Sequence, residues 1–267
     1  MEPSHVRVVL TRFALAVVCF VAAETSRWVA LIGTSSAVEV QASETQAVDT
    51  EPAAPLPPPL QFYKGREIAP YMTFHGADWL VRRERQQEED CSRLLKALNI
   101  KPGQVVCDMG CGNGFYTLRL ARIVGDQGSV LAVDIQPEML SLLDKQLKGK
   151  HIKNVEPVLS TPIDPCLPEG KVDLILIVDV YHEFTYPEHM LKAMRKSLKP
   201  RGRIALAEFR LEDPTVPIKL LHKMSKEQIL KEYEPAGFKL VEQYDELPWQ
   251  HLMFFERDED AAEDNGR

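Results

Sequence analysis

One stretch of the sequence decides the fold: Val105-Val106-Cys107-Asp108-Met109-Gly110-Cys111-Gly112-Asn113-Gly114-Phe115-Tyr116-Thr117. An apolar run ends in an acid, a glycine-rich turn follows, and an amphipathic helix begins. This order predicts a strand, a turn and a helix, the setting in which a nucleotide-like ligand can lie against bare backbone. A side chain at Gly110 or Gly112 would hold such a ligand away from the main chain, and the turn could also require positive φ angles.

The spacing of the glycines narrows the class of ligand. A dinucleotide site needs G-x-G-x-x-G, and Phe115 stands where its last glycine would be. In addition, the carboxylate of Asp108 would repel a pyrophosphate but would suit a ligand that carries an ammonium group. Both features disfavour a nicotinamide-dependent dehydrogenase.

The segment Asp108-Met109-Gly110-Cys111-Gly112-Asn113-Gly114 closely resembles the first motif of class I S-adenosylmethionine (SAM)-dependent methyltransferases, D-x-G-x-G-x-G. The resemblance points to the small-molecule and quinone-type branch of that superfamily and implies SAM as the cofactor. SAM carries an amino group and no phosphate, in agreement with the acid before the turn. In this motif the resemblance assigns the following residues to the cofactor: Asp108, Gly110, Cys111, Gly112 and Gly114.

A second acid supports the same interpretation. Asp134 ends the next expected strand, Ser129–Asp134, where a carboxylate can accept hydrogen bonds from both ribose hydroxyls. This position matches the acidic second motif of the family. The resemblance then places Ile135 or Gln136 against the adenine.

Two later segments extend the resemblance. The loop of residues 160–168 corresponds to the third motif and would bring Ile163 and Asp164 near the adenine, although a turn before proline accounts for Asp164 equally well. The apolar strand Asp173–Val178 then runs into the fourth motif, Asp179-Val180-Tyr181-His182-Glu183-Phe184, whose first residue is assigned to the cofactor.

The candidate catalytic residues follow in that fourth motif, which lies beside the reactive methyl in the family: Tyr181, His182 and Glu183. One of them could be a general base, and the imidazole of His182 has a suitable intrinsic pKa. Alternatively, His182 and Glu183 only begin and brace the next helix. A sulfonium is a strong electrophile, so positioning and desolvation can supply most of the acceleration without a fixed base. No metal site is expected, because the 5 cysteines form no C-x-x-C pair.

The alternation of strands and helices from residue 104 to 256 predicts an α/β protein with a doubly wound sheet. The family resemblance specifies seven mostly parallel strands in the order 3-2-1-4-5-7-6, the last strand antiparallel, with helices on both faces. A helix is expected over Val81–Leu98, with Asp78 as its N-cap. It would form a lid over the methionine end of SAM. Four residues before it could line that end or brace the helix: Tyr71, Phe74, His75 and Trp79.

Two features near the carboxyl end of the domain complete the expectation. Ser225 opens a capping box for the last helix. The segment Pro248–His251, between the last two strands, could reach back to the site.

The ends of the chain differ from its centre. Residues 1–42 read as a signal peptide or N-terminal anchor, because the apolar run Phe13–Ala23 is shorter than a membrane span of about 20 residues. Residues 43–60 read as a disordered proline-rich linker, residues 61–256 as the methyltransferase domain, and residues 257–267 as an acidic disordered tail. We therefore expect export or membrane anchoring through the N-terminal segment. A cytoplasmic protein with a disordered leader is the alternative.

The length of 267 residues allows one sizeable domain with flanking segments, and the formal net charge of −7 argues against a general nucleic-acid binder. The expected partner is a small-molecule methyl acceptor, and the N-terminal segment allows association with a membrane. Oligomeric state is not predicted. The alternative function is a non-catalytic SAM-binding or partner-binding module, which would not need the polar residues 181–183.

Overall fold

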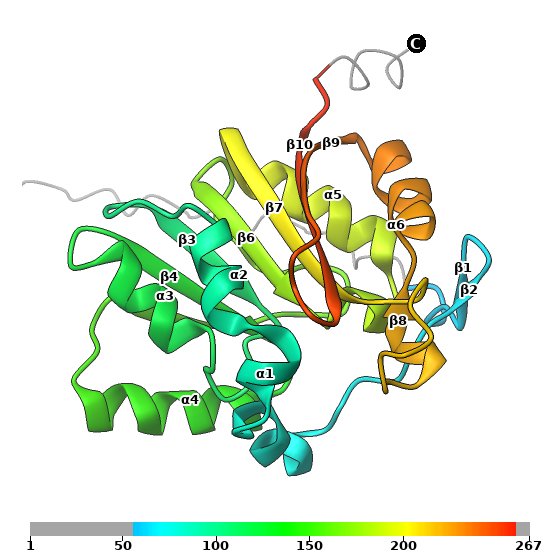
Figure 1. The fold of residues 1–267 in the computed structure, drawn as a ribbon. Helices are drawn as coiled ribbons and strands as arrows, with labels where there is room; N and C mark the ends of the chain where they lie inside the picture. The colour runs from blue at the N-terminus through cyan, green and yellow to red at the C-terminus, as the bar shows by residue number, and fades with distance from the viewer. Residues whose placement is uncertain (1–55, 260–267) are drawn as a thin grey trace, which may run out of the picture. The chain divides into compact units, whose positions relative to one another are not determined.

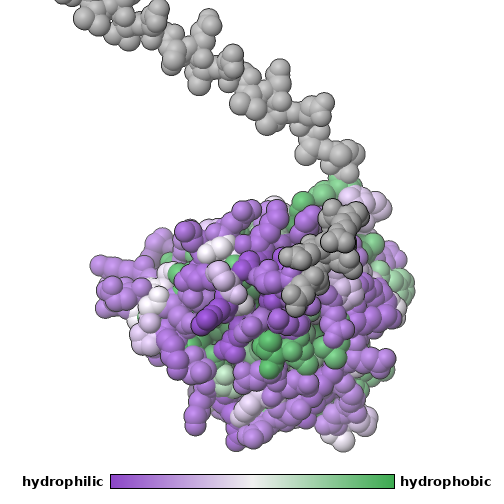
Figure 2. Space-filling model, turned by 90° about the horizontal axis from the view of Figure 1, so that it is seen from above, coloured by the Kyte–Doolittle hydropathy of each residue, from purple (hydrophilic) through white to green (hydrophobic). Residues whose placement is uncertain are grey.

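A computed structural model describes residues 56–259. The predicted leader, most of the predicted linker and most of the acidic tail lie outside these residues. Within residues 56–259, no helix combines the length and the apolar character that a membrane span requires. The face shown in Figure 2 is mostly hydrophilic, with hydrophobic side chains gathered in a few small areas.

The centre of the structure is a sheet with the order β5-β4-β3-β6-β7-β10-β9. Its strands are β3 (Val105–Met109), β4 (Ser129–Asp134), β5 (Val155–Leu159), β6 (Val172–Val178), β7 (Leu198–Arg210), β9 (Phe238–Tyr244) and β10 (Gln250–Arg257). Strand β10 is antiparallel to both of its neighbours, whereas the pairs from β5 to β7 are parallel. In chain order this is 3-2-1-4-5-7-6, so the predicted fold is confirmed. A short strand not predicted from the sequence, β8 (Lys223–Met224), pairs with the end of β7.

Helices cover both faces of this sheet (Figure 1). The helices α2 (Cys91–Ala97), α3 (Thr117–Val124) and α4 (Pro137–Lys150) pack on one face, and α5 (Pro187–Ser197) and α6 (Lys226–Tyr233) pack on the other. Side chains alternate between the faces, so that on β4 Val130 faces α3 while Leu131 faces the opposite core. The sheet is therefore buried on both sides, as its apolar strands require.

The prediction of one continuous helix over Val81–Leu98 is wrong. The chain forms a 3-10 helix, η1 (Phe74–Val81), then α1 (Arg85–Glu89) and α2. The breaks fall at Arg82, which is extended, and at Asp90, which is left-handed with a φ of 45°. Aspartate tolerates this conformation, and the Asp90 side chain accepts a hydrogen bond from the Arg93 amide.

Asp90 is therefore the N-cap of α2. Asp78, the predicted N-cap, lies inside η1 and makes no capping hydrogen bond there.

The first described residues pack against α6 and against the loop before α5. A hairpin not predicted from the sequence, β1 (Phe62–Tyr63) with β2 (Arg66–Glu67), precedes η1. Arg66 pairs with Glu232 of α6 at 2.7 Å, and the Leu60 amide donates to the Thr185 carbonyl at 3.1 Å. Contacts with the domain thus begin before residue 61, the predicted boundary.

Candidate active site

A cavity of about 970 Å³ opens at the carboxyl ends of β3, β4 and β6. This is the switch point of a doubly wound sheet, because the chain runs outward in opposite directions from β3 and β6. The volume is near the upper end of the roughly 300–1,000 Å³ common for ligand pockets. It leaves room for a cofactor and a second molecule.

Most of the predicted site residues line this cavity. They are Asp108, Gly110, Cys111, Gly112, Asp134, Ile135, Gln136, Asp179, His182 and Glu183. Of the residues expected to line the methionine end, Tyr71 and Trp79 also line the cavity, whereas Phe74 and His75 do not.

Tyr181 is a correction, because the structure turns it away from the cavity. Its side chain is fully buried in the core, and its hydroxyl donates to Glu232 Oε2 at 2.8 Å. Residues 181–183 form the 3-10 helix η2 (Tyr181–Glu183), in which successive side chains diverge by roughly 120°. His182 can therefore line the cavity while Tyr181 points into the core.

Gly114, Ile163 and Asp164 also lie outside the cavity lining. Gly114 serves packing, because a Cβ there would lie 2.5 Å from Leu143 Cδ1 of α4. Asp164 closes a turn in which its amide donates to Thr161 Oγ1 at 3.0 Å and its carboxylate accepts from the Cys166 amide. The turn role left open for Asp164 is the one observed. The loop reaches the cavity instead through the preceding residues, Ser160, Thr161 and Pro162.

The glycine turn has the positive φ angles expected of it. Gly110 and Gly112 have φ values of 70° and 54°. A Cβ at Gly110 would lie 2.6 Å from both γ-methyl carbons of Val180. The amides of Gly110 and Cys111 both donate to the Val133 carbonyl, which ties the turn to β4. Glycine is needed here for its conformation and for the close approach of the next loop.

Asp134 is held in one orientation by two backbone amides. Its Oδ2 accepts from Gly112 at 2.8 Å, and its Oδ1 accepts from Gln136 at 2.9 Å. Burial raises the pKa of this carboxyl, although the amide hydrogen bonds oppose the shift. Each oxygen retains a lone pair for a further donor, so the carboxylate can still receive ribose hydroxyls.

An acidic residue, Asp108, and a basic residue, Arg85, line the cavity near the carboxyl end of β3. Asp108 is buried and accepts a short hydrogen bond from Thr117 Oγ1. Burial raises its pKa to about 6. Arg85 of α1 lines the same cavity and pairs with the buried Glu89 at 2.7 Å. Arg85 was not predicted as a site residue, because the sequence there shows only a charged helical stretch.

Asp179 occupies the end of β6 in a left-handed conformation, with a φ of 53°. Its Oδ2 accepts from Gln250 Nε2 at 2.7 Å, so the expectation that Pro248–His251 reaches back to the site is confirmed for Gln250. Its Oδ1 is buried and has no partner among the described residues. Burial, with a further contribution from Glu89, raises the pKa of Asp179 well above its usual value. A buried oxygen of this kind is available for a hydrogen bond with a polar group of a ligand.

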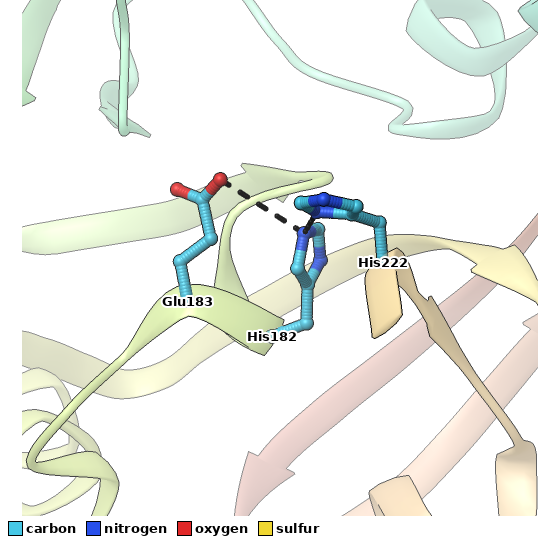
Figure 3. A group of neighbouring side chains, drawn as sticks. All are labelled: His182, Glu183 and His222. Atoms are coloured by element: carbon cyan, nitrogen blue, oxygen red, sulfur yellow. Dashed lines mark hydrogen bonds and ion pairs between the residues drawn. The ribbon is translucent and has the colours of Figure 1, made fainter. Parts of the chain in front are cut away.

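A polar cluster also lines the cavity: His182, Glu183 and His222 (Figure 3). His182 Nε2 lies 3.1 Å from His222 Nδ1 and 4.0 Å from Glu183 Oε1. On its other side, His182 Nδ1 lies 2.7 Å from Glu208 Oε2 of β7. His182 is thus fixed between a buried carboxylate and the cavity.

Burial and the neighbouring ionisable groups shift the pKa values of the residues in this cluster. Burial acts to lower the pKa of His182, but Glu208 outweighs it and raises that pKa. Burial raises the pKa of Glu183 to about 7. Burial, and then the neighbouring His182, lower the pKa of His222.

Sequence reasoning missed Glu208 and His222. An acid inside the apolar strand Ile204–Phe209 was the available signal for Glu208, whereas no pattern marks His222. Apolar side chains also line the cavity, among them Phe184, Tyr186, Met190, Phe209, Pro217 and Ile218.

This sheet order, with a glycine turn after β3 and acids at the ends of β3 and β4, defines the class I SAM-dependent methyltransferase fold. The sequence model of the family described as "Methyltransferase domain" matches residues 100–253. The chain belongs to this family. The cofactor of class I methyltransferases is SAM.

Individual relatives agree with that assignment. The chain is 32% identical over 161 residues to a ubiquinone/menaquinone biosynthesis C-methyltransferase of Vibrio parahaemolyticus, covering 58% of each protein. It is 28% identical over 127 residues to a demethylmenaquinone methyltransferase of Lactobacillus johnsonii, covering 47% of this chain and 51% of that protein. The chain therefore spans about half the length of the curated relatives it matches.

A solved structure covers more of the domain. The SAM-dependent methyltransferase from Aquifex aeolicus superposes with a TM-score of 0.65 at 25% identity, over 69% of this chain and 98% of that one. A type 11 methyltransferase from Sulfolobus solfataricus, with a TM-score of 0.52 at 22% identity, shares the fold.

Proposed function

We propose that the protein transfers the methyl group of SAM to a small molecule with an apolar body and a polar group. One observation carries the proposal: the glycine turn with Asp134 and the cluster around His182 line one and the same cavity. A cofactor and an acceptor could thus meet in one cavity and displace water from it.

The residues at the β3 end suit SAM. Asp134 would receive the ribose hydroxyls, and Asp108 and Arg85 would face the ammonium and carboxylate of its amino-acid part. Asp179 Oδ1, which has no partner among the described residues, would form a hydrogen bond with a further polar group of the ligand. SAM supplies a methyl group on a positively charged sulfur, which makes that methyl electrophilic. The protein's part is to bind, orient and desolvate the reactants.

The part of the cavity around His182 is assigned here to the acceptor and suits an apolar, ring-containing molecule. Phe184, Tyr186 and Phe209 offer aromatic surfaces beside the one polar cluster. The names of the relatives refer to ubiquinone and menaquinone biosynthesis, which supports an acceptor of that general kind. The chain's net charge of −7 gives no support to a nucleic-acid acceptor.

Two measurements on the full-length protein test this function. Calorimetry with S-adenosylhomocysteine should show one site, and labelled SAM should transfer its methyl into an organic-solvent-extractable fraction of a cell extract. Absence of S-adenosylhomocysteine binding would refute the cofactor. Binding with no labelled product in any fraction would instead favour the non-catalytic SAM-binding module.

We also propose that residues 1–42 export or anchor this domain. The apolar run Phe13–Ala23 after Arg7 and Arg12 supports the proposal. Cell fractionation of the full-length protein, with determination of its amino-terminal residue, tests it. A soluble cytoplasmic protein that still begins at Met1 would contradict it.

A further inference from the structure

We propose that His182, Glu183 and His222 bind a divalent transition-metal ion of the zinc type. One ligand atom from each residue lies within 4.8 Å of the other two (Figure 3). All three side chains line the cavity at the end assigned above to the acceptor. The inference rests on the proposed function only for the role of the ion, because the binding itself follows from this geometry.

The first step is the orientation of His182. Glu208 is fully buried, its Oε1 accepts from the His182 amide at 3.2 Å, and its Oε2 lies 2.7 Å from His182 Nδ1. A carboxylate can only accept, so Nδ1 carries the hydrogen. In the neutral ring, Nε2 then presents its lone pair to the cavity. A carboxylate behind a histidine is the arrangement that orients metal-binding histidines.

The second step is the spacing of the donors. Two ligands at about 2.0–2.1 Å from a tetrahedral zinc ion lie roughly 3.3 Å apart. The observed separation of His182 Nε2 from His222 Nδ1 is 3.1 Å. Glu183 Oε1 lies 4.0 Å from the same Nε2, so a side-chain rotation would complete the set. Two histidines and one glutamate are a known donor set of zinc sites that keep one position open.

The third step is charge. Glu183 and Glu208 bring two carboxylates to this end of the cavity, and Arg66, whose Nη1 donates to the His182 carbonyl, is already paired with Glu232. A dication would balance the two acids. Binding of the ion would replace the 3.1 Å contact between His182 Nε2 and His222 Nδ1, and protons would compete with the ion for these nitrogens.

Such an ion would lie in the same cavity as the apolar side chains assigned above to the acceptor. It would bind an oxygen of the acceptor and favour the ionised form of that oxygen, as a Lewis acid does. The acceptor class is therefore narrowed to apolar ring compounds that carry a hydroxyl oxygen.

The test uses the untagged full-length protein, stripped with a chelator and titrated with Co²⁺ at pH 8. We expect saturation at one equivalent with the visible absorption of four- or five-coordinate Co²⁺, and loss of these bands when Zn²⁺ is added. His222→Ala and Glu183→Gln should weaken Co²⁺ binding at least tenfold. His189→Ala, an exposed histidine of α5, should bind as the wild type does. Circular dichroism of each variant confirms that the comparison is made on folded protein.

Two results would overturn the inference: only the spectrum of hydrated Co²⁺, or unchanged bands in folded His222→Ala. Calorimetry with S-adenosylhomocysteine on the same preparations separates this inference from the proposed function. Binding of S-adenosylhomocysteine without Co²⁺ binding refutes the metal site alone. Co²⁺ binding without S-adenosylhomocysteine binding refutes the cofactor and leaves the metal site standing.

Discussion

Gln250 Nε2 donates a hydrogen bond of 2.7 Å to Asp179 Oδ2 and so connects the start of β10 to the end of β6. Both residues are buried or nearly so, and Asp179 is held in a left-handed conformation. The last hairpin of the sheet therefore fixes one acid of the cavity, whose other oxygen has no hydrogen-bond partner within residues 56–259.

Replacing Gln250 by Leu removes the donor from a buried carboxyl. We expect the free energy of unfolding to fall by about 1–3 kcal/mol, the usual cost of an unsatisfied buried polar group. Denaturant-induced unfolding measures the change. Gln243→Leu on β9, where the side chain is exposed, is the matched control and should have little effect. Equal stability of the two variants would contradict the role given to this hydrogen bond.

Asp134→Ala should abolish binding of S-adenosylhomocysteine or weaken it at least about 100-fold. The reason is the loss of two charge-assisted hydrogen bonds, each worth about 1.5–3 kcal/mol. Calorimetry on the full-length protein measures the affinity. Asp164→Ala removes an acid that closes an exposed turn, and its affinity should match that of the wild type. If Asp134→Ala binds normally, the ribose site is elsewhere.

Gly110→Ala tests the close approach of the glycine turn to Val180. The new methyl would meet two carbon atoms at 2.6 Å on a backbone with a φ of 70°. Gly170→Ala has a similar φ of 63° with nothing within 4 Å, so it reports the backbone strain alone. We expect Gly110→Ala to be less stable than Gly170→Ala by about 1–3 kcal/mol, the usual cost of overpacking. It should also lose S-adenosylhomocysteine binding. Equal unfolding free energies would show that Val180 moves freely.

The affinity for S-adenosylhomocysteine should depend on pH through Asp108. Burial raises the pKa of Asp108 to about 6, so this carboxyl is mostly protonated at pH 5 and ionised at pH 7. The ammonium group of the ligand stays charged across that range, because α-amino groups lose their proton only above it. Binding should therefore tighten as the pH rises from 5 to 7 and then level off.

Asp108→Asn is the control for that pH dependence. Asp134 and Glu183 also have raised pKa values, so the variant separates the share that belongs to Asp108. Calorimetry at several pH values should show weaker binding and a flatter pH profile in the variant. A profile as steep as that of the wild type would assign the titration to another group.

Much of the architecture was predictable because its signals are local in sequence. The apolar runs of the strands, the glycine turn and the acids at Asp108 and Asp134 each depend on a few consecutive residues. The sheet order then followed from the resemblance that these motifs carry. The broken helix before β3 was not predictable in this way, because the left-handed turn at Asp90 is compatible with an amphipathic pattern that continues through it.

The sequence by itself determined the sheet, the cofactor class and the acids at the strand ends. Only the tertiary structure decided which neighbours in the fourth motif face the cavity. In the 3-10 helix η2, Tyr181 packs into the core and His182 lines the cavity. The tertiary structure also decided that Glu208 and His222 contact His182, although they lie 26 and 40 residues from His182 in the chain. Contacts of that kind depend on backbone angles and on where distant segments cross, and no local pattern of residues records either.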